Sequence, residues 1–477
     1  SVGSSGSGAS SSDIVQFKLP NSGVMANCYL RYTIQTAIDT AGSDGTNTFA
    51  TEALVADPYA PSAGCIRRMV VSSSDGTEIQ NTNNYHHYCS VMARFKNSRE
   101  YSENQGAVLE GTPSLSGSDM DRVGSNIDAD GGDAVSADEL ALTLTGNYEE
   151  NAKRLNGLAS STNGWLGTST GVVHKFQTGI LDQKAEHLLP LALLGSGMNV
   201  FLHLNDGKDF LRATPNQASV PANKAFNALD IHPVAPSGIN YSLTDLELVC
   251  DLVFYPPEVM SSISNALCQG LKIRTDRVRN QVNAVSQESN VVILNEHARS
   301  VNAVIFGVKN SGDRSNAVRD ENEYYKTPAN GSSSVKEFSF QVGSETLPAS
   351  QPCKFGGQSY CELEKALKAV FDDEFKMGNQ VSNKEYSKAR PADSASAGAG
   401  GAGVNVGGAL MGINLRSHPE LQHSIMSGKS ASSGSIPISC TLDFNGSSSL
   451  SNAEAEFFTI SDQIVEFLSD GSALVHK

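Results

Sequence analysis

Two short motifs contain residues that could catalyse a reaction or hold a cofactor. The run GAGGAG at Gly398–Gly403 has the glycine spacing of a dinucleotide-binding loop, which requires a strand before it and a helix after it. Alternating Ser and Ala precede this run in place of a strand, so we interpret it as a linker. The sequence GTSTG at Gly167–Gly171 matches the turn that presents a nucleophilic serine, here Ser169, but the strand-like VVHKFQ follows where a helix is needed. Neither motif indicates catalysis.

Two further motifs give equally weak indications, one of a phosphate-binding loop and one of a histidine metal site. SGKS at Ser427–Ser430 resembles the end of a phosphate-binding loop, but His423 stands where the first glycine belongs, so we exclude phosphate binding. His86 and His87 have no carboxylate pair and no third ligand near them in the sequence. We interpret both histidines as packing or surface residues.

One acidic segment partly matches a calcium-binding loop. DADGGDAVSADE places Asp128, Asp130 and Glu139 at positions one, three and twelve of such a loop. Asp133 stands where the loop requires glycine. We therefore interpret the segment as a solvated acidic loop, with a weak cation site as the alternative.

The cysteines form no metal or redox motif. They include no CxxC pair and no Cys/His pairing at zinc spacing, so we expect buried free thiols on strands in a reducing compartment. They are Cys28, Cys65, Cys89, Cys250, Cys268, Cys353, Cys361 and Cys440. The sequence thus assigns no catalytic, cofactor-binding or metal-binding residue and implies no cofactor. We predict that the protein is not an enzyme.

Length and charge narrow the class of protein. At 477 residues the chain exceeds what one core usually serves, which predicts two domains. A net charge of -16 argues against direct nucleic-acid binding, which needs clustered Lys and Arg. The longest apolar stretch, Leu188–Leu194, is far shorter than the roughly 20 residues of a membrane helix, so we expect a soluble protein. Residues 1–12 lack a signal-peptide pattern and are expected to form a flexible arm.

Apolar and polar residues alternate with period two along much of the chain, which predicts a mainly β fold. Cys28, Leu30 and Tyr32 share one strand face, and Ile438, Cys440 and Leu442 share another. The strands expected in the first half are 14–19, 28–38, 66–72, 172–178, 198–204 and 246–254. Those expected in the second half are 272–277, 291–294, 301–308, 335–342, 408–415, 436–444 and 459–468.

A short helix is expected between the two halves. Pro256 and Pro257 can begin it, and Gly270 can end it. We place the domain boundary there, which gives a first domain at 13–260 and a second at 261–477.

A second helix and three long loops complete the expected elements. The apolar spacing in 360–371 predicts a helix packed over the end of a sheet. The segments 97–171, 310–334 and 378–407 fit no packed element, and loops of such length are usually functional or disordered.

Several segments resemble the double jelly-roll capsid proteins of adenovirus-like, virophage-like and large eukaryotic DNA viruses. FQTGILDQKAEHLLPLALLGSGMNVFLHLND resembles a strand, leucine-proline turn and strand of that family, and LTDLELVCDLVFYPPEVMSSISNAL resembles its passage between jelly rolls. NVVILNEHARSVNAVIFGVKN and FSFQVGSETLP resemble strands of the second jelly roll. The chain departs from the family at Ala298, Ile305 and Val342, where proline, an aromatic residue and asparagine are common.

The resemblance implies two consecutive eight-stranded jelly-roll β-sandwiches with short helices and long loop insertions. It implies a viral major capsid protein that forms pseudo-hexagonal homotrimers, assembles inside the host cell and tiles the icosahedral shell of a virion. The implied partners are neighbouring capsomers, minor capsid or penton proteins and an internal membrane.

Two other classes remain open from the residues alone. A secreted or surface lectin or adhesin built from two β-sandwiches has the same strand patterns. A glycan-cleaving β-protein would need two carboxylates about 5 Å apart in a cleft, which a sequence cannot show.

Overall fold

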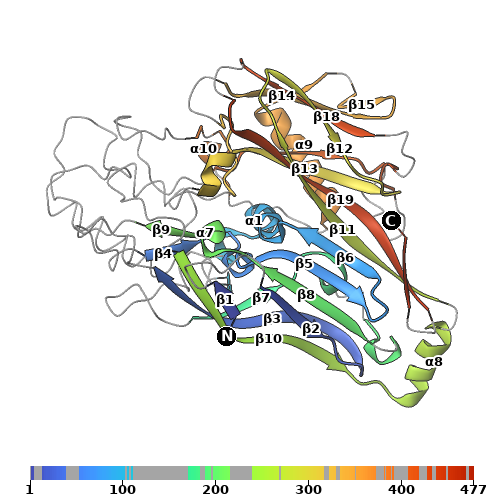
Figure 1. Ribbon diagram of the computed structural model, residues 1–477. Coiled ribbons are helices and arrows are strands. Elements are labelled where there is room, and N and C mark those ends of the chain that lie inside the picture. The colour runs from blue at the N-terminus through green and yellow to red at the C-terminus, as the bar shows by residue number, and fades with distance from the viewer. Residues whose placement is uncertain are drawn as a thin grey trace.

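The computed structural model describes residues 2–4, 13–38, 53–57, 59–101, 105–106, 109–110, 170–182, 189–194, 197–214, 239–267, 270–315, 322–328, 333–349, 351–371, 381, 383–387, 389–390, 407–417, 427–431, 437–446, 450–468 and 472–476. These residues form two β-sandwiches. The sandwich of the N-terminal half lies below that of the C-terminal half in Figure 1.

The first sandwich pairs two four-stranded antiparallel sheets. One has the order β1 (Val2–Ser4), β10 (Ile239–Val253), β3 (Val24–Ile38) and β7 (Thr170–Lys175). The other has the order β2 (Ile14–Lys18), β8 (Met198–Leu204), β5 (Ile66–Ser73) and β6 (Glu78–Asn83). Strands from the beginning and the end of this half are neighbours in both sheets, so neither sheet is complete until both ends of the half have folded.

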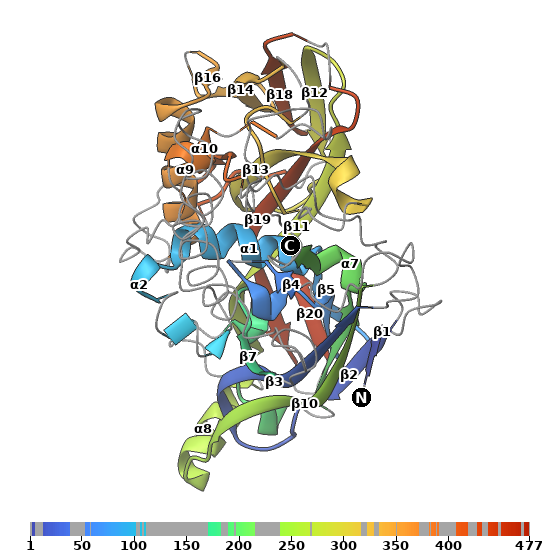
Figure 2. The ribbon, with the colours of Figure 1, turned by 90° about the vertical axis from the view of Figure 1, so that its left-hand side faces the viewer.

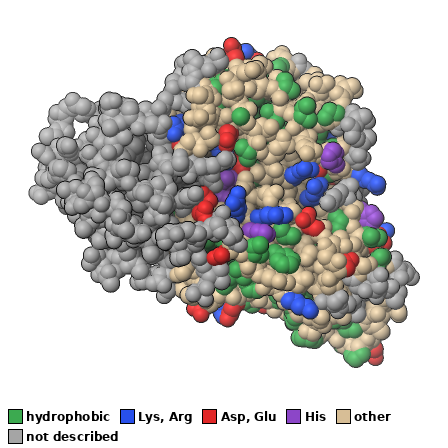
Figure 3. Space-filling view, viewed as in Figure 1, with side chains coloured by type: hydrophobic (Ala, Val, Ile, Leu, Met, Phe, Trp, Pro, Cys, Tyr) green, Lys and Arg blue, Asp and Glu red, His purple; other side chains and the backbone are tan. Residues whose placement is uncertain are grey.

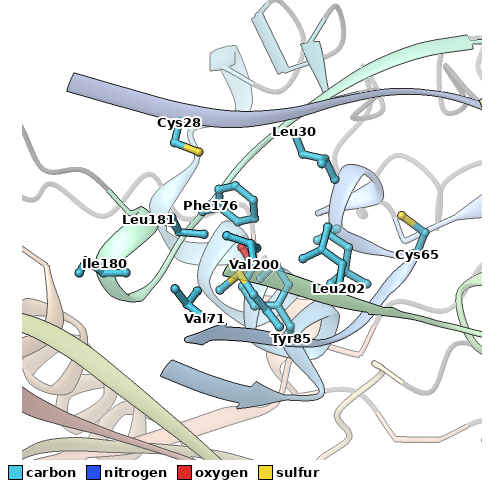
Figure 4. Close-up of a cluster of buried hydrophobic side chains, with 14 of the residues drawn as sticks. Cys28, Leu30, Cys65, Val71, Tyr85, Phe176, Ile180, Leu181, Val200 and Leu202 are labelled. Atoms are coloured by element: carbon cyan, nitrogen blue, oxygen red, sulfur yellow. The ribbon is translucent and has the colours of Figure 1, made fainter. Parts of the chain in front are cut away.

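The core of the first sandwich follows from strand alternation. Along β8, every second side chain from Met198 to Leu204 is buried. Figure 4 shows Val200 and Leu202 of this strand gathered with Leu30 of β3 and Phe176 in one apolar cluster. Burying this surface is the main favourable contribution to folding this half.

Short elements surround this first sandwich. A two-stranded sheet pairs β4 (Ala53–Ala56) with β9 (Leu211–Thr214). Two short helices are α2 (Arg99–Tyr101) and α7 (Gly207–Phe210). Single 3-10 turns are η3 (Pro61–Ala63), η6 (Gly179–Leu181) and η7 (Leu191–Leu193).

The second sandwich also has two antiparallel sheets, each with an additional strand off its main order. The first contains β11 (Leu271–Ala284), β19 (Ala453–Phe467), β13 (Val301–Asn310) and β17 (Leu410–Asn414), with β20 (Ala473–His476) beside β19. The second contains β12 (Ser289–Leu294), β18 (Ile438–Phe444), β14 (Val335–Val342) and β15 (Glu345–Leu347), with β16 (Cys353–Lys354) beside β14.

Aromatic residues fill the second core. The ring of Phe306 on β13 stacks on Phe457 of β19 with centroids 5.1 Å apart. It also meets Phe338 and Phe340 of β14 edge to face. Such pairs add to the stability gained by burying their area.

The longer helices have distinct places. α1 (Tyr85–Lys96) lies between the two sandwiches in both Figure 1 and Figure 2. α8 (Pro257–Leu267) joins the two halves at the lower end of the molecule. α9 (Gly357–Val370) packs on β17 and β13. Two shorter helical segments of this half are η11 (Ser311–Ser315), which follows β13, and α10 (Asn383–Tyr386), which follows α9.

The mainly β fold and the expected strands and helices are confirmed, with differences at their ends. β11 and β19 extend well beyond the predicted 272–277 and 459–468, because polar residues in both sequences interrupt the apolar pattern. β6 was not predicted, since EIQNTN is almost entirely polar. It forms because its backbone pairs with β5 while Ile79, Gln80 and Thr82 are buried.

Parts of the expected arm and loops are ordered elements, which corrects those predictions. Val2–Ser4, within the arm predicted at 1–12, pairs with Tyr241–Leu243 of β10, since backbone hydrogen bonding needs no apolar pattern. Tyr324 and Tyr325, within 310–334, are fully buried. In 378–407, Tyr386 stacks on Phe355. Large buried side chains hold these irregular segments in place, and a sequence without a periodic pattern does not reveal such contacts.

Candidate functional site

The motif at Ser427–Ser430 is part of the scaffold. Lys429 and Val301 exchange backbone hydrogen bonds in an isolated antiparallel bridge, and the Gly428 N–H donates to Ser300 Oγ. The Lys429 ammonium pairs with Glu345 at 2.8 Å. The groups that would face a phosphate are therefore engaged with the protein.

The other sequence motifs lie outside the described residues. This holds for the glycine run at 398–403, for Ser169, and for the acidic loop with Asp128, Asp130, Asp133 and Glu139. Among described residues, no three His, Cys, Asp or Glu side chains are grouped to hold a metal ion.

The two adjacent histidines lie on α1 and are buried. α1 begins after Asn84, whose left-handed backbone (φ 46°) turns the chain from β6 into the helix. Its apolar residues Val91, Met92 and Phe95 pack in one cluster with Ile305 of β13 and Phe458 of β19. A helix that the sequence assigns to the first half therefore contributes to a core of the second half.

Glu456 on β19 is the centre of a buried polar cluster beneath α1. Its Oε1 receives hydrogen bonds from Asn280 at 2.8 Å and from His87 Nδ1, 3.0 Å away. Its Oε2 receives hydrogen bonds from Lys309 Nζ at 2.6 Å and from Tyr324 at 2.9 Å. Four separate segments thus converge on one carboxylate.

The electrostatics of this cluster hold Glu456 ionised. Burial alone would raise the pKa of the carboxyl, because charge is poorly solvated there. The neighbouring His87 and Lys309 outweigh burial and hold the pKa of Glu456 well below its usual range. A carboxylate with every oxygen engaged has no capacity left to bind a substrate.

A second buried cluster links α1 to the loop at 322–328. Asp57 accepts hydrogen bonds from Ser90 of α1 at 2.7 Å and from Asn322 at 2.8 Å. Arg94 of α1 donates to the carbonyls of Asn322 at 2.6 Å and Gly407 at 2.7 Å. Burial opposes ionisation of Asp57, but Arg94 and the hydrogen bonds lower its pKa.

A third cluster lies within the second sandwich. Asp462 of β19 accepts hydrogen bonds from Arg274 at 2.7 Å, from Ser300 at 2.7 Å and from Asn302 at 2.9 Å. Arg416 is a further cation, 3.4 Å away. All three clusters join elements that are far apart in the sequence.

The exposed apolar side chains are the better candidates for function. Val291 (67% exposed) and Ile293 (62%) project from β12, which ends the order of its sheet. Phe254 (71%) stands between β10 and α8, with Val253 and Val259 also exposed. Large exposed apolar residues near each other often mark contacts with other proteins.

Charged groups have a different distribution on the surface. Figure 3 shows basic, acidic and histidine side chains gathered near the middle of the described face, at the height of the junction seen in Figure 1. That face is mixed in sign, so it is no basic surface for nucleic acid.

Sequence reasoning missed the residues of the junction. Lys309 and Glu456 stand within the apolar strands VNAVIFGVKN and AEAEFFTI, and a charge inside an apolar run signals a buried ion pair. The pairing of the two could not be predicted, because 147 positions separate them.

No protein-family model and no curated protein sequence matches the chain. Solved structures do match over nearly its whole length. The VP54 protein of PBCV-1, fitted into a reconstruction of the virophage Sputnik, has a TM-score of 0.52 and 9% identity, covering 98% of this chain and 93% of that one.

Two further structures agree. The Sputnik virophage structure matches with a TM-score of 0.51 and 10% identity, over 98% of this chain and 86% of that one. The Faustovirus major capsid protein matches with a TM-score of 0.51 and 11% identity, over 96% of this chain and 88% of that one. At such low identity the likeness establishes the fold, which is the double jelly roll expected from the sequence.

Proposed function

We propose, from the double jelly-roll fold that this chain shares with proteins of Sputnik, PBCV-1 and Faustovirus, that it is the major capsid protein of an icosahedral DNA virus. The observation that carries the proposal is a pair of β-sandwiches within one chain, the first with eight strands and the second with ten, packed together through α1. A shell subunit needs such rigidity, since its contacts must repeat in every copy.

The proposed unit of assembly is a homotrimer. Three copies of a chain with two similar bodies place six such bodies around a threefold axis. The outline of this trimer is close to hexagonal, so it can meet neighbouring capsomers on six sides and tile a flat facet. We assign the two bodies to 13–260 and 261–477, with the boundary within α8.

The exposed apolar residues are the proposed contacts between copies. Burying Val291 and Ile293, or Phe254, against another subunit would remove apolar area from water without any change in the sandwich cores. Contacts of this kind favour association while each chain folds on its own.

The loop insertions and the N-terminal segment have separate proposed roles. We assign 97–171 to the outer surface of the shell, since its acidic and Gly/Ser-rich composition suits water. Residues 1–12 are proposed to meet a minor capsid protein or an internal membrane. Among the described helices, none has the length and hydropathy to cross a membrane.

The mass of the purified full-length chain in solution tests the proposal. Subunits of 50.4 kDa predict a trimer of about 151 kDa, which should show a hexagonal outline by negative-stain electron microscopy. A stable monomer over the micromolar range would overturn the trimer. A monomer that binds glycans on an array would favour the lectin or adhesin, for which no described residue provides support.

A further inference from the structure

Two cysteines far apart in sequence face each other in the first sandwich. Cys28 on β3 and Cys250 on β10 are direct partners in the antiparallel register, and their sulfur atoms are 3.8 Å apart. The pairs on either side, Asn27 with Asp251 and Tyr29 with Val249, are also in register. The backbone ladder therefore holds the two thiols opposite each other.

The two thiols differ in access to solvent. Cys28 is buried, whereas Cys250 is half-buried beside Leu248 and Leu252 at the margin of the core. A hydrogen bond from Cys28 lowers the pKa of Cys250, while the same contact and burial raise the pKa of Cys28. Cys250 is thus the thiol that a reagent meets first and that ionises first.

We propose that Cys28 and Cys250 form a redox-active dithiol, which a small disulfide of the glutathione type converts into a cross-strand disulfide. This proposal does not depend on assembly into a shell. The other buried thiols among the described residues, Cys65, Cys89, Cys353 and Cys440, have a pKa raised by burial, and each is a free cysteine.

The reaction proceeds in two exchanges. The Cys250 thiolate attacks one sulfur of the oxidant, which forms a mixed disulfide and releases one small thiolate. Cys28 Sγ then attacks Cys250 Sγ while its proton passes to the departing sulfur, so the Cys28–Cys250 bond forms, the mixed disulfide breaks and the second small thiol leaves. Two protein thiols are oxidised, one small disulfide is reduced to two thiols, and the protons go to the two leaving thiolates.

Geometry sets the character of this bond. A disulfide holds its sulfurs about 2.0 Å apart, so the two side chains must turn toward each other. Directly paired residues on antiparallel strands have β-carbons somewhat farther apart than a relaxed disulfide prefers. The bond is therefore expected to form in an oxidising medium and to open again with dithiothreitol.

The closed bond would join segments 222 positions apart. A cross-link over such a long loop restricts the unfolded chain strongly, so the oxidised protein should resist heat better than the reduced one.

The test uses the full-length chain with Cys361→Ser, which removes the exposed thiol on α9 that would also react. After incubation with oxidised glutathione, a non-reducing peptide map should contain Cys28 linked to Cys250, and the melting temperature should rise by about 5 °C. Dithiothreitol should reverse both changes.

Two variants in this background separate the steps. Cys28→Ser should stop at one glutathione on Cys250, and Cys250→Ser should leave Cys28 unmodified in the folded protein. Cys28→Ala serves as a second variant if serine impairs folding. Both thiols remaining free under oxidant, or glutathione appearing first on Cys28, would overturn the proposal whatever the oligomeric state.

Discussion

At the scale of single residues, the buried carboxylates are the groups whose surroundings are most constrained. Glu456, Asp57 and Asp462 are each almost or fully inaccessible and each meets several donors. A buried carboxylate destabilises the folded protein strongly unless such donors compensate its charge. Stability should therefore respond sharply to the loss of one partner and weakly to changes in exposed pairs.

Lys309→Met tests this directly. The substitution keeps the length of the buried side chain but leaves Glu456 without its closest cation, at 2.6 Å. We expect a loss of about 3–5 kcal/mol in the free energy of unfolding, measured by urea denaturation. Lys336→Met, which removes an exposed partner of Glu337, should leave the free energy of unfolding nearly unchanged, because water screens that pair. Equal losses would contradict the role of Lys309.

His174 should make the protein sensitive to mild acid. Burial lowers its pKa from 6.5 to about 3, and its ring nitrogens meet Ser62 and Tyr85, each 3.0 Å away. Below pH 6.5 the unfolded chain gains a proton that the folded chain cannot take up. The contribution of His174 to stability is therefore complete above pH 6.5 and is lost as the pH falls toward 3.

The measurement is the unfolding free energy of wild type and His174→Gln between pH 6.5 and 5. The Glu456 carboxyl stays ionised in the folded protein across this window, because its pKa is held well below its usual range. The wild type should lose stability more steeply than the variant, by up to about 1.4 kcal/mol for each pH unit. Parallel curves would show that His174 is not the titrating group.

At the scale of elements, β13 is the central buried strand of the second half, and the packing of that half is built around it. All ten of its residues are buried, because it has β19 on one side, β17 on the other, and cores on both faces. Gly307 leaves room in this strand for the ring of Tyr324, which reaches across to Glu456. The strand, the loop and the buried cluster thus share one packing constraint.

Gly307→Ala should therefore destabilise the protein. A β-carbon there would lie 2.3 Å from the Tyr324 ring, so strand or ring must move. We expect a cost of about 1–3 kcal/mol in urea denaturation. Gly171→Ala on β7, another strand glycine with no atom of the described residues within 4 Å of the added carbon, is the matched control and should be near neutral. A neutral Gly307→Ala would refute the tight packing.

At the scale of the whole molecule, the two sandwiches share side chains and should unfold together. α1 follows β6 in the first half, yet Tyr88, Val91 and Phe95 pack with residues of the second half. Val465 and Phe467 of β19, in turn, belong to the first core. Neither half has a complete core without the other.

Calorimetry of the purified chain should therefore show one transition, with a calorimetric enthalpy equal to the van't Hoff enthalpy for the cooperative unit. The independent folding of two β-sandwiches would give two transitions instead. That result would mean that the interdomain clusters contribute little to stability.

The sequence by itself determined the elements whose pattern is local. Alternating apolar residues located β8 and β18 nearly to the residue, and the apolar residues of β14 located that strand. Pro256 and Pro257 located α8, and helical spacing of apolar residues located α9. In a strand or helix with one buried face, apolar residues recur at the period of that element, about 2 residues in a strand and about 3.6 in a helix. The same local patterns, taken in order, resemble the double jelly roll, and the fold agrees.

Only the tertiary structure decided which distant residues meet. The pairing of Cys28 with Cys250, the donors around Glu456 and the placement of α1 between two cores each join segments far apart in sequence. Polar β6 and the buried Tyr324 show the same limit, because their neighbours, and not their own sequence, bury them. Local periods follow from backbone geometry, whereas contacts across the chain depend on how whole sheets pack, and no single segment encodes that packing.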